Sequence, residues 1–127
     1  MAFILEREKT TTTPYVLIDE EKKYMKFEGK SYLEDVIDFF QDINDWLEKY
    51  LSGENIELTF DCAMKYFNSS TTKIIYNMLR SMDKSAGSGA KITVNWIVGE
   101  ANDMMIECGE DFEEEMESLT FNLVTEE

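Results

Sequence analysis

Histidine is absent from the sequence, and cysteine is nearly so. Histidine is the commonest general base in enzymes, so the group that most often activates a serine or cysteine nucleophile is missing. The two cysteines, Cys62 and Cys108, lie far apart and form no C-x-x-C pair. We interpret them as buried apolar side chains and expect no metal or redox role.

Glycine-rich phosphate-binding loops are also missing. Gly87-Ser88-Gly89 lacks the lysine of a Walker motif and follows a helical pattern instead of preceding one. Acidic residues are abundant, so a catalytic or metal-binding pair of carboxylates remains an alternative. No spacing, however, singles out any two of them. We therefore predict a protein that is not an enzyme and has no cofactor, with an enzyme as the least favoured alternative.

Basic residues are few. The chain has 12 Lys and Arg residues against 27 Asp and Glu residues, which gives a formal net charge of −15. This charge repels nucleic acid and an anionic membrane surface, so we expect neither as a partner. No segment approaches the roughly 18 apolar residues of a spanning helix, and the charged start does not resemble a secretory signal. We expect a cytoplasmic protein without membrane insertion.

Apolar side chains, in contrast, are plentiful. Of the 127 residues, 43% are hydrophobic, which is enough for one buried core. We predict a single domain over residues 1–127. Thr10 to Thr13 and the single proline, Pro14, precede the first β-prone run. Residues 1–14 are therefore predicted to be a mobile lead-in.

The first half of the domain is predicted to contain a hairpin and a helix. Two β-prone runs, Tyr15–Ile18 and Tyr24–Phe27, indicate two strands, the second ending at Gly29. An S-x-x-E capping box begins at Ser31, so a helix is predicted to start there. Apolar residues then recur at helical spacing as far as Leu51.

The second half alternates strands and helices. Alternating apolar residues predict strands at 56–62, 92–98 and 119–123, and helical spacing predicts helices at 74–82 and 101–116, the last weakened by Gly109. The order ββαβαβαβ predicts an α/β domain with a mixed sheet and helices packed on it. The acidic residues around the third helix are interpreted as a solvated face, with an acidic partner-binding surface as the alternative.

A run of small polar residues precedes the second helix, namely Asn68, Ser69, Ser70, Thr71 and Thr72. One Asn or Ser is enough to cap a helix, so this run has more hydroxyls than capping requires. Free amides and the positive end of a helix dipole stabilise an anion, so a phosphate attached here is compatible with the fold. A phosphorylation site is one interpretation of the run, and a plain helix cap is the other.

The stretch Tyr66-Phe67-Asn68-Ser69-Ser70-Thr71-Thr72-Lys73, with Ile56–Phe60 and Ile43–Leu51 before it, resembles the SiaC family of bacterial regulatory phosphoproteins. The resemblance covers roughly residues 29–96. It implies a STAS-like domain similar in fold to anti-anti-sigma factors. Asn68 stands where those factors usually have Asp, and Thr71 where Gly often follows, which favours the SiaC branch over a sigma-factor regulator.

The resemblance also implies a partner-switching function. A dedicated Ser/Thr kinase would phosphorylate the residue after the motif asparagine, here Ser69, with Ser70 and Thr71 as alternative acceptors, and a PP2C-type phosphatase would reverse the modification. The unmodified form would bind and activate a diguanylate cyclase in the control of cyclic-di-GMP and biofilm formation. A constitutive scaffolding domain of the same fold, in which the run serves only as a cap, is the alternative hypothesis.

Overall fold

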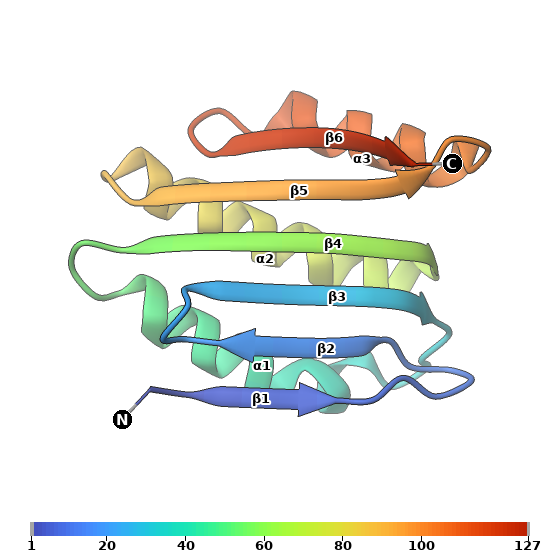
Figure 1. The fold of residues 1–127 in the computed structure, drawn as a ribbon, viewed down its shortest axis with the longest axis horizontal. Coiled ribbons are helices and arrows are strands. Elements are labelled where there is room, and N and C mark those ends of the chain that lie inside the picture. Colours follow the sequence, from blue (N-terminus) through green and yellow to red (C-terminus); the bar gives the residue numbers. More distant parts are fainter. Residues whose placement is uncertain (1, 127) are drawn as a thin grey trace.

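The computed structural model describes residues 2–126 as one six-stranded sheet with three helices. Figure 1 shows the sheet in front and all three helices behind it. The elements follow in the order β1 (Ile4–Arg7), β2 (Tyr15–Asp19), β3 (Tyr24–Ser31), α1 (Val36–Leu51), β4 (Glu57–Phe67), α2 (Ser69–Gly87), β5 (Lys91–Gly99), α3 (Asp103–Glu115) and β6 (Thr120–Glu126).

Strand order in the sheet is the same as strand order in the chain. The first three strands pair antiparallel, and β3, β4, β5 and β6 pair parallel. Each parallel pair is joined by one helix, and crossovers of one handedness place the helices on one face of the sheet. The predicted mixed sheet with helices packed on it is therefore confirmed, whereas the STAS-like assignment stays a prediction.

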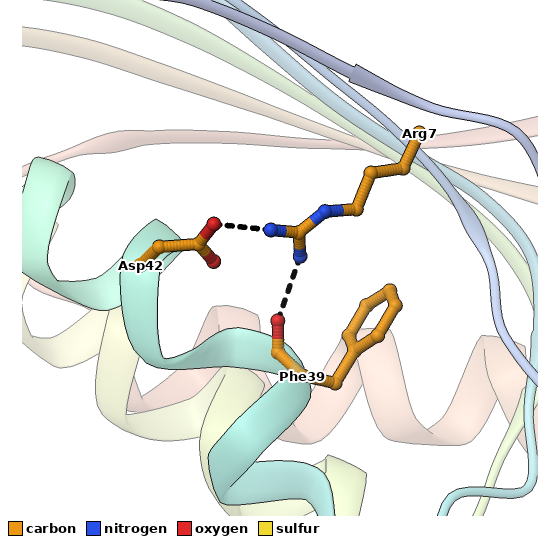
Figure 2. A network of polar contacts seen from close by, with 3 residues as sticks. All are labelled: Arg7, Phe39 and Asp42. Carbon is orange, nitrogen blue, oxygen red and sulfur yellow. Dashed lines mark hydrogen bonds and ion pairs between the residues drawn. The ribbon is translucent and has the colours of Figure 1, made fainter.

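The structure adds a strand that the sequence analysis did not predict. Residues 4–7 of the expected mobile lead-in form β1, which pairs with β2, so the order is βββαβαβαβ. The guanidinium group of Arg7 donates to the Phe39 carbonyl (2.8 Å), forms an ion pair with Asp42 and lies over the Phe39 ring (Figure 2). These partners belong to α1, so local sequence could not reveal what fixes β1.

The predicted start of the first helix is wrong. Ser31 is the buried last residue of β3, which continues past Gly29 through an irregular register. Gly29 has a φ of +111°, which a residue without a Cβ adopts readily. The helix begins instead at Val36, where Asp35 accepts a hydrogen bond from the Asp38 amide (3.4 Å). Ser31 has the spacing of a cap, but tertiary burial determines its role.

The face of the sheet opposite the helices is polar and hydrogen-bonded. The Tyr24 hydroxyl donates to Asp61 (2.6 Å), the Asn95 amide group donates to Asp61 (2.8 Å), and the Asn122 amide group donates to Asn95 (3.0 Å). Burial and the hydrogen bond to Asp61 raise the pKa of Tyr24. This row joins β3, β4, β5 and β6 through side chains on the face that carries no helix.

The core lies between the sheet and the helices, and Trp96 is its largest fully buried side chain. The Trp96 indole donates to the Met105 carbonyl (2.9 Å) and packs edge-on against Phe112 (ring centroids 5.4 Å apart). Gly109, which was expected to weaken α3, allows this packing: a Cβ there would lie 2.4 Å from Trp96 Cδ1. The glycine therefore brings α3 close to the sheet.

Substitution Gly109→Ala is expected to destabilise the fold by about 1–3 kcal/mol, because overpacking at Trp96 outweighs the better helix propensity of alanine. The change in the free energy of unfolding, from urea titration, measures this. Gly99→Ala is the control, because a Cβ at Gly99 meets nothing within 4 Å. Equal stability of the two variants would contradict the close-packing role of Gly109.

A second tertiary link closes the end of the domain. The Asp83 carboxylate in α2 accepts hydrogen bonds from the amides of Glu117 (3.1 Å), Ser118 (2.7 Å) and Leu119 (3.0 Å). Partial burial raises the pKa of Asp83, but the three amide hydrogen bonds outweigh it, so the net pKa lies below its ordinary value. The ionised carboxylate thus fixes the connection between α3 and β6.

Because the pKa of Asp83 is lower in the folded state, its contribution to stability is present above the unfolded pKa of about 4 and is lost as the pH falls through the folded value. We expect Asp83→Asn to be less stable than wild type at pH 7, and the difference to shrink at about pH 3. Urea titrations at both pH values measure this, with exposed Asp111→Asn as the control. A difference that is independent of pH would rule out the ionised carboxylate as the cause.

Candidate functional site

The candidate site lies at the carboxyl ends of β3, β4 and β5, where the three helices begin (Figure 1). Strand β4 ends at Phe67 and α2 begins at Ser69, so only Asn68 separates them. The first amides of a helix have no partner within the helix, and its dipole places partial positive charge there. This edge therefore combines several helix starts in one region of the surface.

Asn68 connects this helix start to the end of β3 through its main chain and to the β3–α1 connection through its side chain. Its side-chain oxygen accepts from the Thr71 amide (3.0 Å), its side-chain NH₂ donates to the Leu33 carbonyl (2.8 Å), and its main-chain amide donates to the Ser31 carbonyl (3.2 Å). An aspartate could accept the first of these bonds but could not donate the second. This explains structurally why asparagine occupies the position.

The five residues of the predicted run have different environments. Thr71 is fully buried, and its hydroxyl is hydrogen-bonded to the buried Ser31 hydroxyl (2.8 Å). Thr72 donates its hydroxyl to the Asn68 carbonyl (3.0 Å). The side chains of Ser69 and Ser70 are exposed and make no hydrogen bond within residues 2–126. Among these hydroxyls, the structure therefore buries that of Thr71 and exposes those of Ser69 and Ser70.

The neighbouring helices run parallel to α2 and begin at the same level. Ser81 donates to Glu48 across the α1–α2 contact (2.9 Å), and each residue lies twelve positions into its helix (48−36 and 81−69). On the other side of α2, the rings of Tyr76 and Phe112 are 5.8 Å apart, seven and nine positions into their helices (76−69 and 112−103). The first turns of α1 and α3 therefore flank the first turn of α2.

Exposed apolar side chains accompany the two serines, and sequence reasoning missed them. Ile37, in the first turn of α1, is 63% exposed, and Met104, in the first turn of α3, is 51% exposed. Tyr32 is 45% exposed and stacks on Tyr66 (ring centroids 4.9 Å apart) at the end of β4. Ile37 and Met104 occur in apolar patterns that predict burial, so only the tertiary arrangement reveals them as exposed.

This surface combines exposed hydroxyls, helix amides without an intrahelical partner and exposed apolar side chains. Phosphate oxygens on Ser69 would lie beside unpaired helix amides, which favours an anion. The cysteines offer no reactive thiolate nearby: burial raises the pKa of Cys62, and partial burial followed by the charge of Asp111 raises that of Cys108 to about 11. Cys62 is buried as predicted, and Cys108 is half-buried.

Residues 2–126 offer neither a metal-binding cluster nor a membrane-spanning helix. None of these residues form a group of three or more Cys, Asp or Glu side chains arranged to hold a metal ion. The helices in this range are also too short or too polar to cross a membrane.

The fold and the site define an α/β protein with a mixed sheet and two exposed hydroxyls at a helix start. The family model described as "SiaC family regulatory phosphoprotein" matches residues 7–126. Because this match covers nearly the whole chain, the chain belongs to the SiaC family of regulatory phosphoproteins. The resemblance inferred from residues 29–96 is thereby confirmed.

Individual relatives agree with this family. An uncharacterized protein of Pseudomonas aeruginosa is 26% identical over 106 residues, which are 84% of each chain. The solved structure of SiaC of Pseudomonas aeruginosa matches with a TM-score of 0.89 and 22% identity, covering 98% of this chain and 99% of that one. A structure of the diguanylate cyclase SiaD in complex with its activator SiaC, from the same organism, matches with a TM-score of 0.90 and 24% identity over 96% and 99%. The solved structures confirm the fold.

The role of Asn68 can be tested with an isosteric change. Asn68→Asp is expected to lower the free energy of unfolding by about 1–3 kcal/mol, because a carboxylate oxygen would face the Leu33 carbonyl without a donor. Urea titration measures the change. Asn77→Asp, on the exposed face of α2, is the matched control. Equal stability of both variants would show that the bond to Leu33 contributes little.

Proposed function

We propose that this chain is a phosphorylation-controlled binding protein that switches between partners through Ser69. The unmodified form binds and activates an effector, a diguanylate cyclase, in the cytoplasm. A Ser/Thr kinase phosphorylates Ser69, with Ser70 as the alternative acceptor, and thereby releases the effector. A PP2C-type phosphatase restores the binding form.

One observation supports this proposal most directly: Ser69 and Ser70 are exposed and make no side-chain hydrogen bond, while Asn68 already caps α2. The two serines are therefore not needed as caps. A constitutive scaffolding domain would require no reachable hydroxyl at this position. Buried Thr71 and hydrogen-bonded Thr72 complete the local fold and leave the serines available for modification.

The surroundings of the serines make a phosphate disruptive to docking. A phosphoserine adds about −1.5 to −2 charges at pH 7. A partner that covers Ile37 or Met104 would also cover the phosphate. Removing this charge from water costs free energy unless the partner supplies an opposite charge. If this costs about 2.8 kcal/mol, partner affinity falls about a hundredfold. The fold itself tolerates the charge because the helix start favours an anion.

The nature of the effector is supported by the family and by one complex. The chain belongs to a family of regulatory phosphoproteins, and SiaC of Pseudomonas aeruginosa is described as the activator of the diguanylate cyclase SiaD. The fold match to SiaC in that complex covers almost the whole chain. Activation of a cyclase would link this protein to cyclic-di-GMP levels and biofilm formation.

The proposal predicts opposite effects for two substitutions at Ser69. Ser69→Asp is expected to weaken binding to the diguanylate cyclase of the same genome by about tenfold or more, because it places a charge in the docked surface. Ser69→Ala is expected to bind like the wild type. Titration calorimetry measures both affinities, and mass spectrometry after incubation with kinase and ATP locates the phosphate.

Ser88→Asp provides the matched control, because Ser88 is exposed at the opposite end of α2. This variant is expected to bind like the wild type. Equal affinities of Ser69→Asp and Ser69→Ala would remove Ser69 from the mechanism. A phosphate found only outside residues 69–70 would contradict the assignment of the acceptor.

A further inference from the structure

The solvent-facing side of α2 carries a row of basic side chains, which we call the basic ridge: Lys73, Arg80 and Lys84, with Asn77 between them. The four side chains are exposed and recur at spacings of four, three and four residues, so they share one face of the helix. None of the three cations forms an ion pair within residues 2–126, where the pairs are Arg7–Asp42 and Lys26–Glu28. The ridge is therefore an unpaired positive surface.

The ridge is unusual for this chain because its surroundings are acidic. Helix α3 has seven acidic residues and no basic one, and α1 has four acidic residues and a single lysine. Helix α2 has one acidic residue, Asp83, and its carboxylate is occupied by three amides of the α3–β6 connection. A chain of net charge −15 thus carries a positive row between two negative helices.

The ridge begins at the candidate site. Ser69 lies four positions before Lys73, so the two side chains are neighbours on the helix surface. At the far end, Arg80 and Lys84 line a shallow depression with Glu115 and Glu117, which reduces the positive potential there. The cation nearest the serines, Lys73, is therefore the strongest candidate for a partner contact.

We propose that the basic ridge is the docking surface for an acidic segment of the effector, and this inference rests on the proposed function above. Complementary charge selects the partner: acidic side chains are attracted by the ridge, while a second basic surface is repelled. A nucleic acid does not fit, because the three cations of the ridge are too few to neutralise a long row of phosphates on a chain of net charge −15.

The ridge also suggests how a phosphate at Ser69 would weaken the docking of an acidic partner. Phosphoserine at position 69 would pair with the Lys73 ammonium one helical turn away and so remove that cation from the docking surface. The remaining negative charge would face an acidic partner and repel it. Phosphorylation would thus reverse the sign of the ridge where it begins.

The test is binding of the diguanylate cyclase of the same genome to the full chain, measured by titration calorimetry at low and high salt. The double variant Lys73→Glu with Arg80→Glu is expected to bind about tenfold more weakly at low salt, and the wild-type affinity is expected to fall as salt rises. The control is Lys22→Glu with Lys49→Glu, which makes the same charge change at exposed positions outside the ridge and is expected to stay within about twofold of wild type.

The outcomes separate this inference from the proposed function. If the wild type binds the cyclase and both double variants lose affinity equally, net charge and not the ridge is responsible, and the inference fails. If both double variants bind like the wild type, the inference also fails while the proposed function stands. If the wild type does not bind the cyclase, the proposed function fails and the inference fails with it.

A double-mutant cycle tests the link between Ser69 and Lys73. Ser69→Asp is expected to weaken binding less in a Lys73→Gln background than in the wild type, because the cation it would neutralise is already gone. The same cycle with Lys84→Gln is the control, since Lys84 lies fifteen positions from Ser69 (84−69). Strict additivity in the Lys73 cycle would show that the two residues act independently.

Discussion

The arrangement of the site depends on the hydrogen bonds of Asn68. They join the end of β3, the end of β4 and the first turn of α2 at one point, and the buried pair of Ser31 and Thr71 reinforces this junction. Main-chain amides, carbonyls and hydroxyls that burial would otherwise leave without partners are satisfied there. Because the cap is complete without Ser69 and Ser70, the fold leaves these two hydroxyls unused. Of the five adjacent residues, Asn68, Thr71 and Thr72 make hydrogen bonds that hold the fold, while Ser69 and Ser70 remain exposed.

The sequence predicted the repeated elements well because their signals are local. Alternation in β4 and β5 and helical spacing in α1 and α2 are properties of short windows, and the structure confirms those elements. Strand β1 was missed because its anchors, Phe39 and Asp42, belong to a distant helix. Ser31 was misassigned for the same reason: its spacing to Glu34 matches a capping box, while its buried partner Thr71 lies forty positions away.

The candidate site shows the same division between local and tertiary information. The run from Asn68 to Thr72 was visible in the sequence, but sequence could not separate exposed Ser69 from buried Thr71, because hydroxyl residues of similar chemistry stand side by side. Ile37 and Met104 occur in apolar patterns, and only the parallel alignment of the helices places them beside the serines. The basic ridge is readable as a spacing, yet its isolation between acidic helices requires the fold.

The identical order of strands in chain and sheet also has a consequence for how the molecule assembles. Every strand pairs with the strand that precedes it, so no pairing waits for a segment synthesised much later. Paired residues of neighbouring parallel strands are 27 to 36 positions apart (120−93 and 66−30), so each pairing closes a loop that contains only one crossover helix. A nascent chain can therefore extend its sheet one edge at a time during translation. The final connection, from α3 into β6, is then held by the single carboxylate of Asp83 on α2.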